Sequence, residues 1–228
     1  MMPTVFITGI DTDAGKSVAT GLLARWLCTA GYSVITQKIA QTGCEKYSED
    51  ILLHRKLMGI APTDEDREAL SCPYLFSIPA SPHLAAAREQ QRIDPEVISR
   101  AAETLEKRYE YLIIEGVGGL YVPLNESLTV LDYLTRKRYP VILVSSAKLG
   151  SINHTLLSLE ALSRRKLKVL GILYNEFPPE DPLIAEDSQQ IFKRFLKEFG
   201  YQDRLISIPR IDFDGAALPH VDFSNFFI

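Results

Sequence analysis

Cysteines are scarce in this sequence, and no motif pairs them. Only Cys28, Cys44 and Cys72 occur among 228 residues, and no Cys-x-x-Cys pair is present. An odd number of scattered cysteines predicts neither a disulfide framework nor a zinc knuckle. We therefore expect idle or buried thiols in a reducing compartment.

Long apolar runs and basic blocks are missing too. The N-terminus lacks the charged start and apolar run of a signal peptide, and no stretch of about 18 apolar residues follows. Lys and Arg number 25 against 29 Asp and Glu, a net charge of −4, and no basic block of the kind that neutralises a phosphate backbone is present. We expect a cytoplasmic protein with no membrane segment and no nucleic-acid partner.

What the sequence has is an alternation of short aliphatic runs with longer segments of helical periodicity, which is typical of a parallel α/β sheet. No linker composition and no repeat interrupts it, so a single domain over residues 1–228 is expected. Segment 61–82, rich in Pro, Ser and acidic residues, predicts an excursion from the sheet. The apolar end 223–228 fits an edge strand, an interface or a weak membrane contact, with packing on its own domain favoured. Predicted strands are 4–8, 33–38, 111–115, 141–146, 168–174 and 204–208; predicted helices are 17–30, 49–57, 94–108, 130–137, 153–165 and 185–199.

The strongest local signal lies between the first predicted strand and the first predicted helix. Gly9-Ile-Asp-Thr-Asp-Ala-Gly15-Lys16-Ser17 departs from the standard phosphate loop, because five residues separate its glycines instead of four. A turning backbone and a helix N-terminus at this point bind an anion. Lys16 would reach the β and γ phosphates, and the Ser17 hydroxyl would ligate Mg²⁺. The alternative is a strand-to-helix turn that contains Gly-Lys-Ser by chance.

The third predicted strand ends in a carboxylate. Tyr111-Leu-Ile-Ile-Glu115 is apolar up to Glu115, and Gly116-Val117-Gly118-Gly119 comes next. Nucleotide-binding α/β proteins offer an acidic group to the metal from this position, and the glycines allow close backbone approach to a ligand. A Glu at a strand end is otherwise a solvated terminus.

Four blocks together resemble the dethiobiotin synthetase family: Gly9–Ser17, KIAQTG from Lys38, EGVGG from Glu115 and KLGSINH from Lys148. The resemblance spans roughly residues 4–175. It implies a three-layer P-loop NTPase-like α/β fold with a mostly parallel central sheet flanked by helices. It also implies ring closure of 7,8-diaminopelargonate with CO₂, driven by ATP and Mg²⁺, through a carbamate and a carbamic-phosphoric anhydride.

The resemblance implies roles residue by residue. Lys38, Lys16 and Thr12 are the implied catalytic residues, and Ser17, Asp50 and Glu115 the metal ligands, with Glu49 as an alternative to Asp50. Substrate contacts are implied for Thr12, Lys38, Thr42, Gly150, Ser151 and Asn153; the last three are placed at a twofold interface of a homodimer, where Ser151 is a plausible helix cap. Nucleotide contacts are implied for Asp13, Ala14, Gly15, Lys16, Ser17, Val18, Asp50, Glu115, Gly116, Val117, Gly118, Asn175 and Pro209.

Two features depart from the family pattern, and three other functions are alternatives. Ile39 replaces the family's usual Pro after the lysine, and Glu176 and Pro209-Arg210 align only loosely. A partitioning-type ATPase would carry a lysine five residues before the loop lysine, where this chain has Asp11. A small-molecule kinase would have an arginine-rich lid, and segment 61–82 has only Arg67. A non-catalytic nucleotide-gated module would not need Lys38.

Overall fold

The computed structural model of the chain describes residues 4–177, 181–213 and 218–227. Within these residues the central sheet has six strands in the order β10-β9-β8-β1-β5-β2, and every neighbouring pair is parallel. These strands are β1 (Thr4–Gly9), β2 (Val34–Lys38), β5 (Tyr111–Gly119), β8 (Val141–Ser146), β9 (Val169–Asn175) and β10 (Leu205–Ile208). Because all six run the same way, their carboxyl ends meet at one edge, where ligands bind in this architecture.

Helices and two small sheets complete the described chain. The pair β3 (Gln41–Thr42) and β4 (Leu75–Phe76) is parallel, and the pair β6 (Pro123–Asn125) and β7 (Leu128–Thr129) is antiparallel. The helices are α1 (Lys16–Thr29), α2 (Glu49–Met58), α3 (Asp64–Arg67), α4 (Pro82–Arg88), α5 (Pro95–Arg108), α6 (Val130–Lys137), α7 (Ser151–Arg164) and α8 (Pro182–Glu198), with 3-10 turns η1 (Thr12–Ala14) and η2 (Ser224–Phe226).

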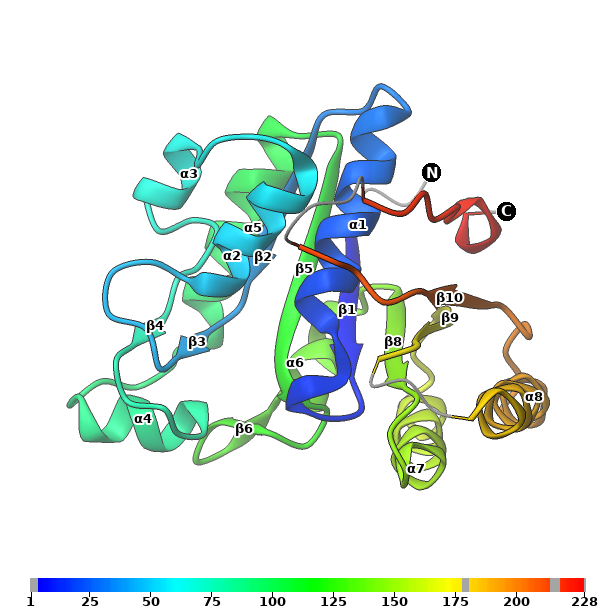
Figure 1. The fold of residues 1–228 in the computed structure, drawn as a ribbon. Helices are drawn as coiled ribbons and strands as arrows, with labels where there is room; N and C mark the ends of the chain where they lie inside the picture. The colour runs from blue at the N-terminus through cyan, green and yellow to red at the C-terminus, as the bar shows by residue number, and fades with distance from the viewer. Residues whose placement is uncertain (1–3, 178–180, 214–217, 228) are drawn as a thin grey trace.

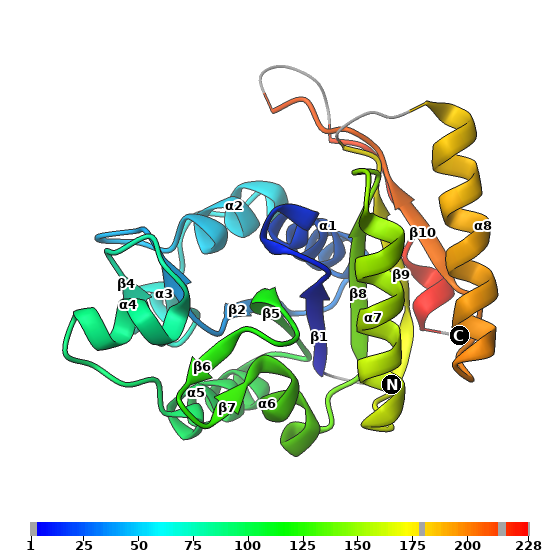
Figure 2. The same ribbon diagram turned by 90° about the horizontal axis from the view of Figure 1, so that it is seen from below.

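Apolar cores lie on both faces of the sheet, because successive side chains of a strand point to opposite faces. In β1, Phe6 belongs to the core that includes residues of α5, α6, α7 and α8. Val5 and Ile7 belong to the core that includes residues of α1, α2 and the C-terminal segment. Figure 2 shows α1 and α2 on one side of β1, β5 and β2, and α5 and α6 on the other. The result is the expected three-layer arrangement of helices, sheet and helices.

The six predicted strands and six predicted helices are all present, with shifted ends. The start of α5 is as predicted, since the Asp94 carboxylate accepts a hydrogen bond from the Glu96 amide and Pro95 is the first helical residue. Two expectations were wrong. Glu115 lies inside β5, because the strand continues to Gly119, which pairs with Gly9. Ser151 is the first residue of α7 and makes no capping hydrogen bond; the cap is Gly150, at φ 93°.

Segment 61–82 leaves the central sheet as predicted, although it is more ordered than its composition indicates. It holds α3, β4 and the first residue of α4, and β4 pairs with β3. Figure 1 shows this region beyond β2, on the side of the molecule opposite α8 and β10. The excursion therefore forms a wall beside the carboxyl end of β2.

The apolar C-terminal segment packs on its own chain. Phe223 and Phe226 are fully buried in the core that includes α1, and Trp26 stacks on Phe227 with ring centroids 5.7 Å apart. The expectation that this segment packs on its own domain is thus confirmed for the described residues 218–227, which form no edge strand. No described helix is long and apolar enough to cross a membrane.

Candidate active site

A cavity of about 730 Å³ opens at the carboxyl edge of the central sheet, beside the loops that follow β1, β2 and β5. Segment 79–82, before and at the start of α4, closes one side of it. Thirteen residues implied by the resemblance line it: Thr12, Asp13, Gly15, Lys16, Ser17, Val18, Lys38, Thr42, Asp50, Glu115, Val117, Gly118 and Asn175. Residues far apart in the sequence are therefore gathered around one space.

The loop after β1 curls as a phosphate loop does. Gly15 adopts φ 97°, a left-handed conformation that favours glycine, and α1 begins at the next residue. The Lys16 Nζ atom folds back and donates to the carbonyls of Asp11 at 2.7 Å and Thr12 at 2.9 Å. Burial, together with the charge of Lys38, lowers the pKa of Lys16 to about 8. An ammonium group held in a tight backbone turn is suited to an anionic ligand.

A buried lysine lies between two carboxylates next to that loop. Lys38, the last residue of β2, is 4% exposed, and its Nζ lies 2.6 Å from Asp50 Oδ2 and 2.7 Å from Glu115 Oε1. The Ser17 hydroxyl donates to Asp50 Oδ1 at 2.7 Å and lies 3.0 Å from Glu115 Oε1. Glu49, the alternative to Asp50, is exposed at the start of α2 and does not line the cavity.

The charged side chains of Lys38 and Glu115 stabilise each other. Burial alone would raise the pKa of Glu115, but Lys38 and a hydrogen bond from His54 outweigh it and hold the pKa at about 2. Burial alone would lower the pKa of Lys38, but Glu115 and Asp50 outweigh it and hold the pKa above its ordinary value. The site therefore keeps a lysine cation and a carboxylate anion side by side at neutral pH.

The oxygen atoms near Ser17 are suited to Mg²⁺. The Ser17 hydroxyl and the carboxylates of Asp50 and Glu115 come from α1, α2 and β5 and converge within hydrogen-bond distance. Mg²⁺ prefers oxygen ligands and usually takes one or two carboxylates together with substrate phosphates and water. Within the described ranges, no group of three or more His, Cys, Asp or Glu side chains is placed to hold a metal.

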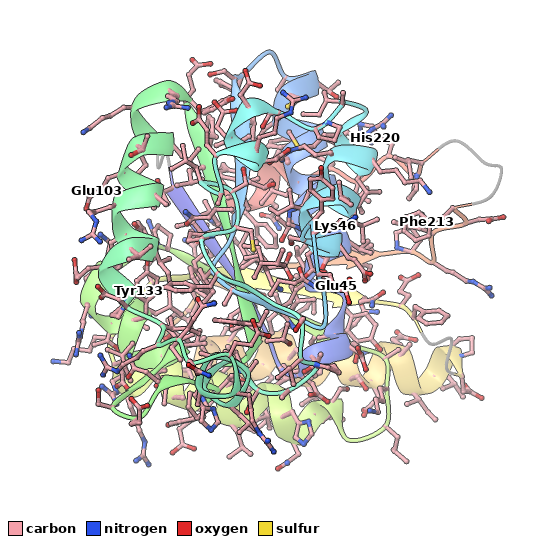
Figure 3. The ribbon with its side chains drawn as sticks, turned by 90° about the vertical axis from the view of Figure 1, so that its left-hand side faces the viewer. Glu45, Lys46, Glu103, Tyr133, Phe213 and His220 are labelled. Atoms are coloured by element: carbon pink, nitrogen blue, oxygen red, sulfur yellow. The ribbon has the colours of Figure 1, made fainter. Side chains whose placement is uncertain are left out.

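A second, smaller cavity of about 270 Å³ adjoins the first. Val18, Asn175 and Phe177 line both, and Pro209 and Arg210 line the second one. The Asn175 Nδ2 atom donates to the Ala14 carbonyl at 3.2 Å, which ties the end of β9 to the phosphate loop. Figure 3 shows Phe213, which also lines this cavity, on the side of the molecule opposite Glu103 of α5.

Several implied residues lie away from the main cavity. Gly116 faces the Phe6 ring, since a Cβ added there would lie 2.9 Å from Phe6 Cε1. Ala14 is buried and contributes its carbonyl to Asn175. The remaining three, Gly150, Ser151 and Asn153, begin α7 or precede it and do not line either of these cavities as the structure describes them.

Sequence reasoning missed a buried histidine beside the charged cluster. His54 is fully buried in α2, and its Nε2 lies 2.7 Å from Glu115 Oε2. It follows Asp50 by four residues, so the two side chains lie on one face of the helix. That spacing was the available signal; the partner, Glu115, is 61 residues away in sequence.

The sequence of the chain is similar to those of known proteins. A family model described as an AAA domain matches residues 3–212. A relative from Pasteurella multocida named ATP-dependent dethiobiotin synthetase BioD 2 is 50% identical over 199 residues, covering 87% of this chain and 93% of the relative. A relative from Chlorobaculum tepidum named ATP-dependent dethiobiotin synthetase BioD is 49% identical over 212 residues, covering 93% of this chain and 87% of the relative.

Solved structures give the same fold at low identity. The structure of pNOB8 ParA bound to nonspecific DNA superimposes with a TM-score of 0.55 at 12% identity, covering 96% of this chain and 89% of that one. A ParA family ATPase from Chlorobium tepidum gives a TM-score of 0.54 at 15% identity, covering 92% and 84%. At such identities the likeness concerns the fold alone, which is the three-layer P-loop α/β fold.

Proposed function

The chain belongs to the ATP-dependent dethiobiotin synthetase family, and from this premise we propose how its own residues perform the reaction. It is an ATP-dependent ligase of biotin biosynthesis that forms C–N bonds. Its reaction closes a ring from 7,8-diaminopelargonate and CO₂ and gives dethiobiotin, ADP and phosphate. The relatives favour this reading over a partitioning-type ATPase or a small-molecule kinase. We propose that residues 1–228 act as one domain.

The observation that carries the mechanism is the buried lysine pair beside the phosphate loop. One amine of the substrate attacks CO₂, loses a proton and becomes a carbamate. A carbamate oxygen then attacks the γ-phosphorus while the bond to the β-phosphate breaks, and the second amine displaces phosphate to close the ring. Two anions meet in the phosphoryl step, so catalysis depends on neutralising charge where it develops. Lys16 and Lys38 supply that charge, and Thr12 and Thr42 lie beside the reacting groups.

Magnesium is proposed to bind at Ser17, Asp50 and Glu115. When bound, the ion would add positive charge at the phosphate oxygens. The support is the convergence of the three oxygen donors around Ser17. The chain's own contribution is to hold these donors in place, since Lys38 lies against both carboxylates.

The nucleotide is proposed to lie along the phosphate loop with its base toward Asn175 and Pro209. The phosphates are framed by Asp13, Gly15 and Val18 on one side and by Val117 and Gly118 on the other, all of which line the main cavity. The support is the continuity of the two cavities through Val18 and Asn175. The Arg210 guanidinium lies 5.7 Å from the centre of the Phe177 ring, which gives that cavity a flat, partly aromatic wall.

The substrate carboxylate is proposed to bind at Gly150, Ser151 and Asn153 of a partner copy in a homodimer. The support is an apolar surface around a cavity of about 450 Å³, in which Tyr121 is 66% exposed and Leu157 is 55% exposed. Leu149, beside the proposed carboxylate loop, is 89% exposed. Exposed apolar side chains gathered around a hollow are typical of interfaces. Sedimentation tests this, since Leu157→Asp is expected to give monomers.

Three free thiols, at Cys28, Cys44 and Cys72, fit the reducing cytoplasm in which we propose the enzyme acts.

The function itself is tested by phosphate release from ATP with diaminopelargonate and bicarbonate, each omitted in turn. Release that requires both compounds, with dethiobiotin as the product, is the expected result. Release that is independent of either compound contradicts the proposal.

A further inference from the structure

Next to the charged cluster lies a network of buried polar side chains that have no role in the proposed mechanism. Its members come from β2, α2 and segment 64–71. His54, Thr36 and Ser71 are fully buried, and Arg55 is 1% exposed. Burying such groups is costly unless every donor finds an acceptor.

Hydrogen-bond contacts connect this network to Glu115. Arg55 Nη1 donates to Thr36 Oγ1 at 2.8 Å, and Thr36 Oγ1 lies 3.0 Å from His54 Nδ1. His54 Nε2 lies 2.7 Å from Glu115 Oε2. Arginine only donates and an ionised carboxylate only accepts. The direction at both ends is therefore fixed, and His54 carries a hydrogen on Nε2 that it donates to Glu115.

Arg55, at the end of the network farthest from Glu115, is itself held in place. Arg55 makes a two-point ion pair with Asp66, at 3.0 Å from Nε and 2.7 Å from Nη2. The same Nη2 lies 3.2 Å from Ser71 Oγ, and the Ser71 carbonyl accepts from the Lys38 amide at 2.7 Å. Two-point arginine–carboxylate pairs fix geometry as well as energy. One arginine thus supports both the histidine and the backbone of the lysine.

We propose that His54 is a positioning residue that turns the Glu115 carboxylate so that only Oε1 faces the reaction site. With Oε2 occupied by His54, Oε1 is the oxygen that meets Lys38 at 2.7 Å and Ser17 at 3.0 Å. A carboxylate without this partner would rotate, and its contact with a bound ion would lose its fixed direction. Side chains that orient a ligating carboxylate in this way typically change metal affinity or activity by about 10- to 100-fold when they are replaced.

This inference rests on the proposed role of Glu115, and its test does not require the synthetase reaction. The dissociation constant of ADP is measured by calorimetry with and without Mg²⁺. For wild type we expect tighter binding with Mg²⁺. For His54→Leu we expect unchanged binding without Mg²⁺ and a loss of most of the Mg²⁺-dependent gain, about 10- to 100-fold in the Mg²⁺ concentration needed. A purely structural role would change both conditions or neither.

Two further variants decide the case if His54→Leu fails to fold. His54→Gln keeps an N–H donor near the Nε2 position and is expected to recover most of the Mg²⁺-dependent gain. Thr36→Val removes the hydroxyl behind the histidine and is expected to show a smaller loss of the same kind. His220→Leu, at an exposed histidine of the C-terminal segment, is the matched control and should behave as wild type.

The proposal is overturned if His54→Leu keeps the wild-type response to Mg²⁺, if folded His54→Gln loses as much as His54→Leu, or if wild type itself shows no Mg²⁺-dependent gain. Failure of the synthetase function would appear differently, as absence of dethiobiotin from wild type with diaminopelargonate and bicarbonate present. The ADP measurement would still judge His54 in that case.

Discussion

Replacement of Lys38 with alanine removes the cation between two carboxylates and separates its catalytic role from nucleotide binding. Lys38 lies 2.6 Å from Asp50 and 2.7 Å from Glu115, and Glu115 has no exposed surface. Loss of a preorganised positive group at a site of developing charge typically costs about 10²- to 10³-fold in kcat. We expect a loss of that size in dethiobiotin formation, with ADP affinity kept within about tenfold.

The same variant has a calculable effect on stability. The pKa of Glu115 lies at about 2 instead of 4.5, which at about 1.4 kcal/mol for each pH unit corresponds to about 3 kcal/mol of folding free energy at neutral pH. Because Lys38 is the largest favourable influence on that carboxylate, Lys38→Ala should lose most of this amount. Urea unfolding at pH 7 measures the loss.

The sign of the pH dependence provides a check. A carboxyl whose folded pKa is lowered contributes stability above its unfolded pKa, and the contribution disappears as pH falls through the folded pKa. The stability difference between wild type and Lys38→Ala should therefore shrink as pH falls from about 4.5 toward 2, the range set by Glu115.

Lys46→Ala is the matched control, because Lys46 is exposed on the loop before α2 (Figure 3). It should change neither turnover nor stability. Turnover of Lys38→Ala within about tenfold of wild type, which is about 1.4 kcal/mol in activation free energy, would refute the catalytic role. A stability difference that stays constant from pH 7 to acid would refute the argument from Glu115.

Other positions give sharp expectations. Gly15→Ala places a Cβ 2.5 Å from Asn175 Nδ2 at φ 97°, so ADP affinity should fall, with about 1–2 kcal/mol of backbone cost; calorimetry showing an unchanged dissociation constant contradicts this. Phe226→Ala empties a fully buried position and should cost about 3–5 kcal/mol in urea unfolding without lowering kcat of the folded protein; a loss near zero would disagree. Nucleotide binding near pH 8 should take up protons, because phosphates raise the pKa of Lys16 from about 8; binding heats that do not depend on buffer ionisation enthalpy would speak against it.

The local sequence was enough to predict the helices and strands of the fold and to identify the phosphate loop. Strands such as β1 and β8 are mostly apolar and are buried on both faces, as a sheet covered on two sides requires, and Asp94-Pro95 marks a helix start by its own chemistry. Gly15-Lys16-Ser17 was recognisable because a phosphate loop is built from consecutive residues. Composition likewise indicated that segment 61–82 would leave the sheet.

Only the tertiary structure decided how the charges meet. The contacts of Glu115 with Lys38, Ser17 and His54 join residues 61 to 98 positions apart, and no local pattern encodes such distances. Whether Asp50 or Glu49 faces the site depended on how α2 is rotated against α1 and β2. The end of β5 was also decided by tertiary contacts, since the strand continues past Glu115 to Gly119, which pairs with Gly9. Spacing along a chain reports which side chains share a turn or a face, whereas burial, pKa values and the orientation of a carboxylate follow from the neighbours that folding brings to it.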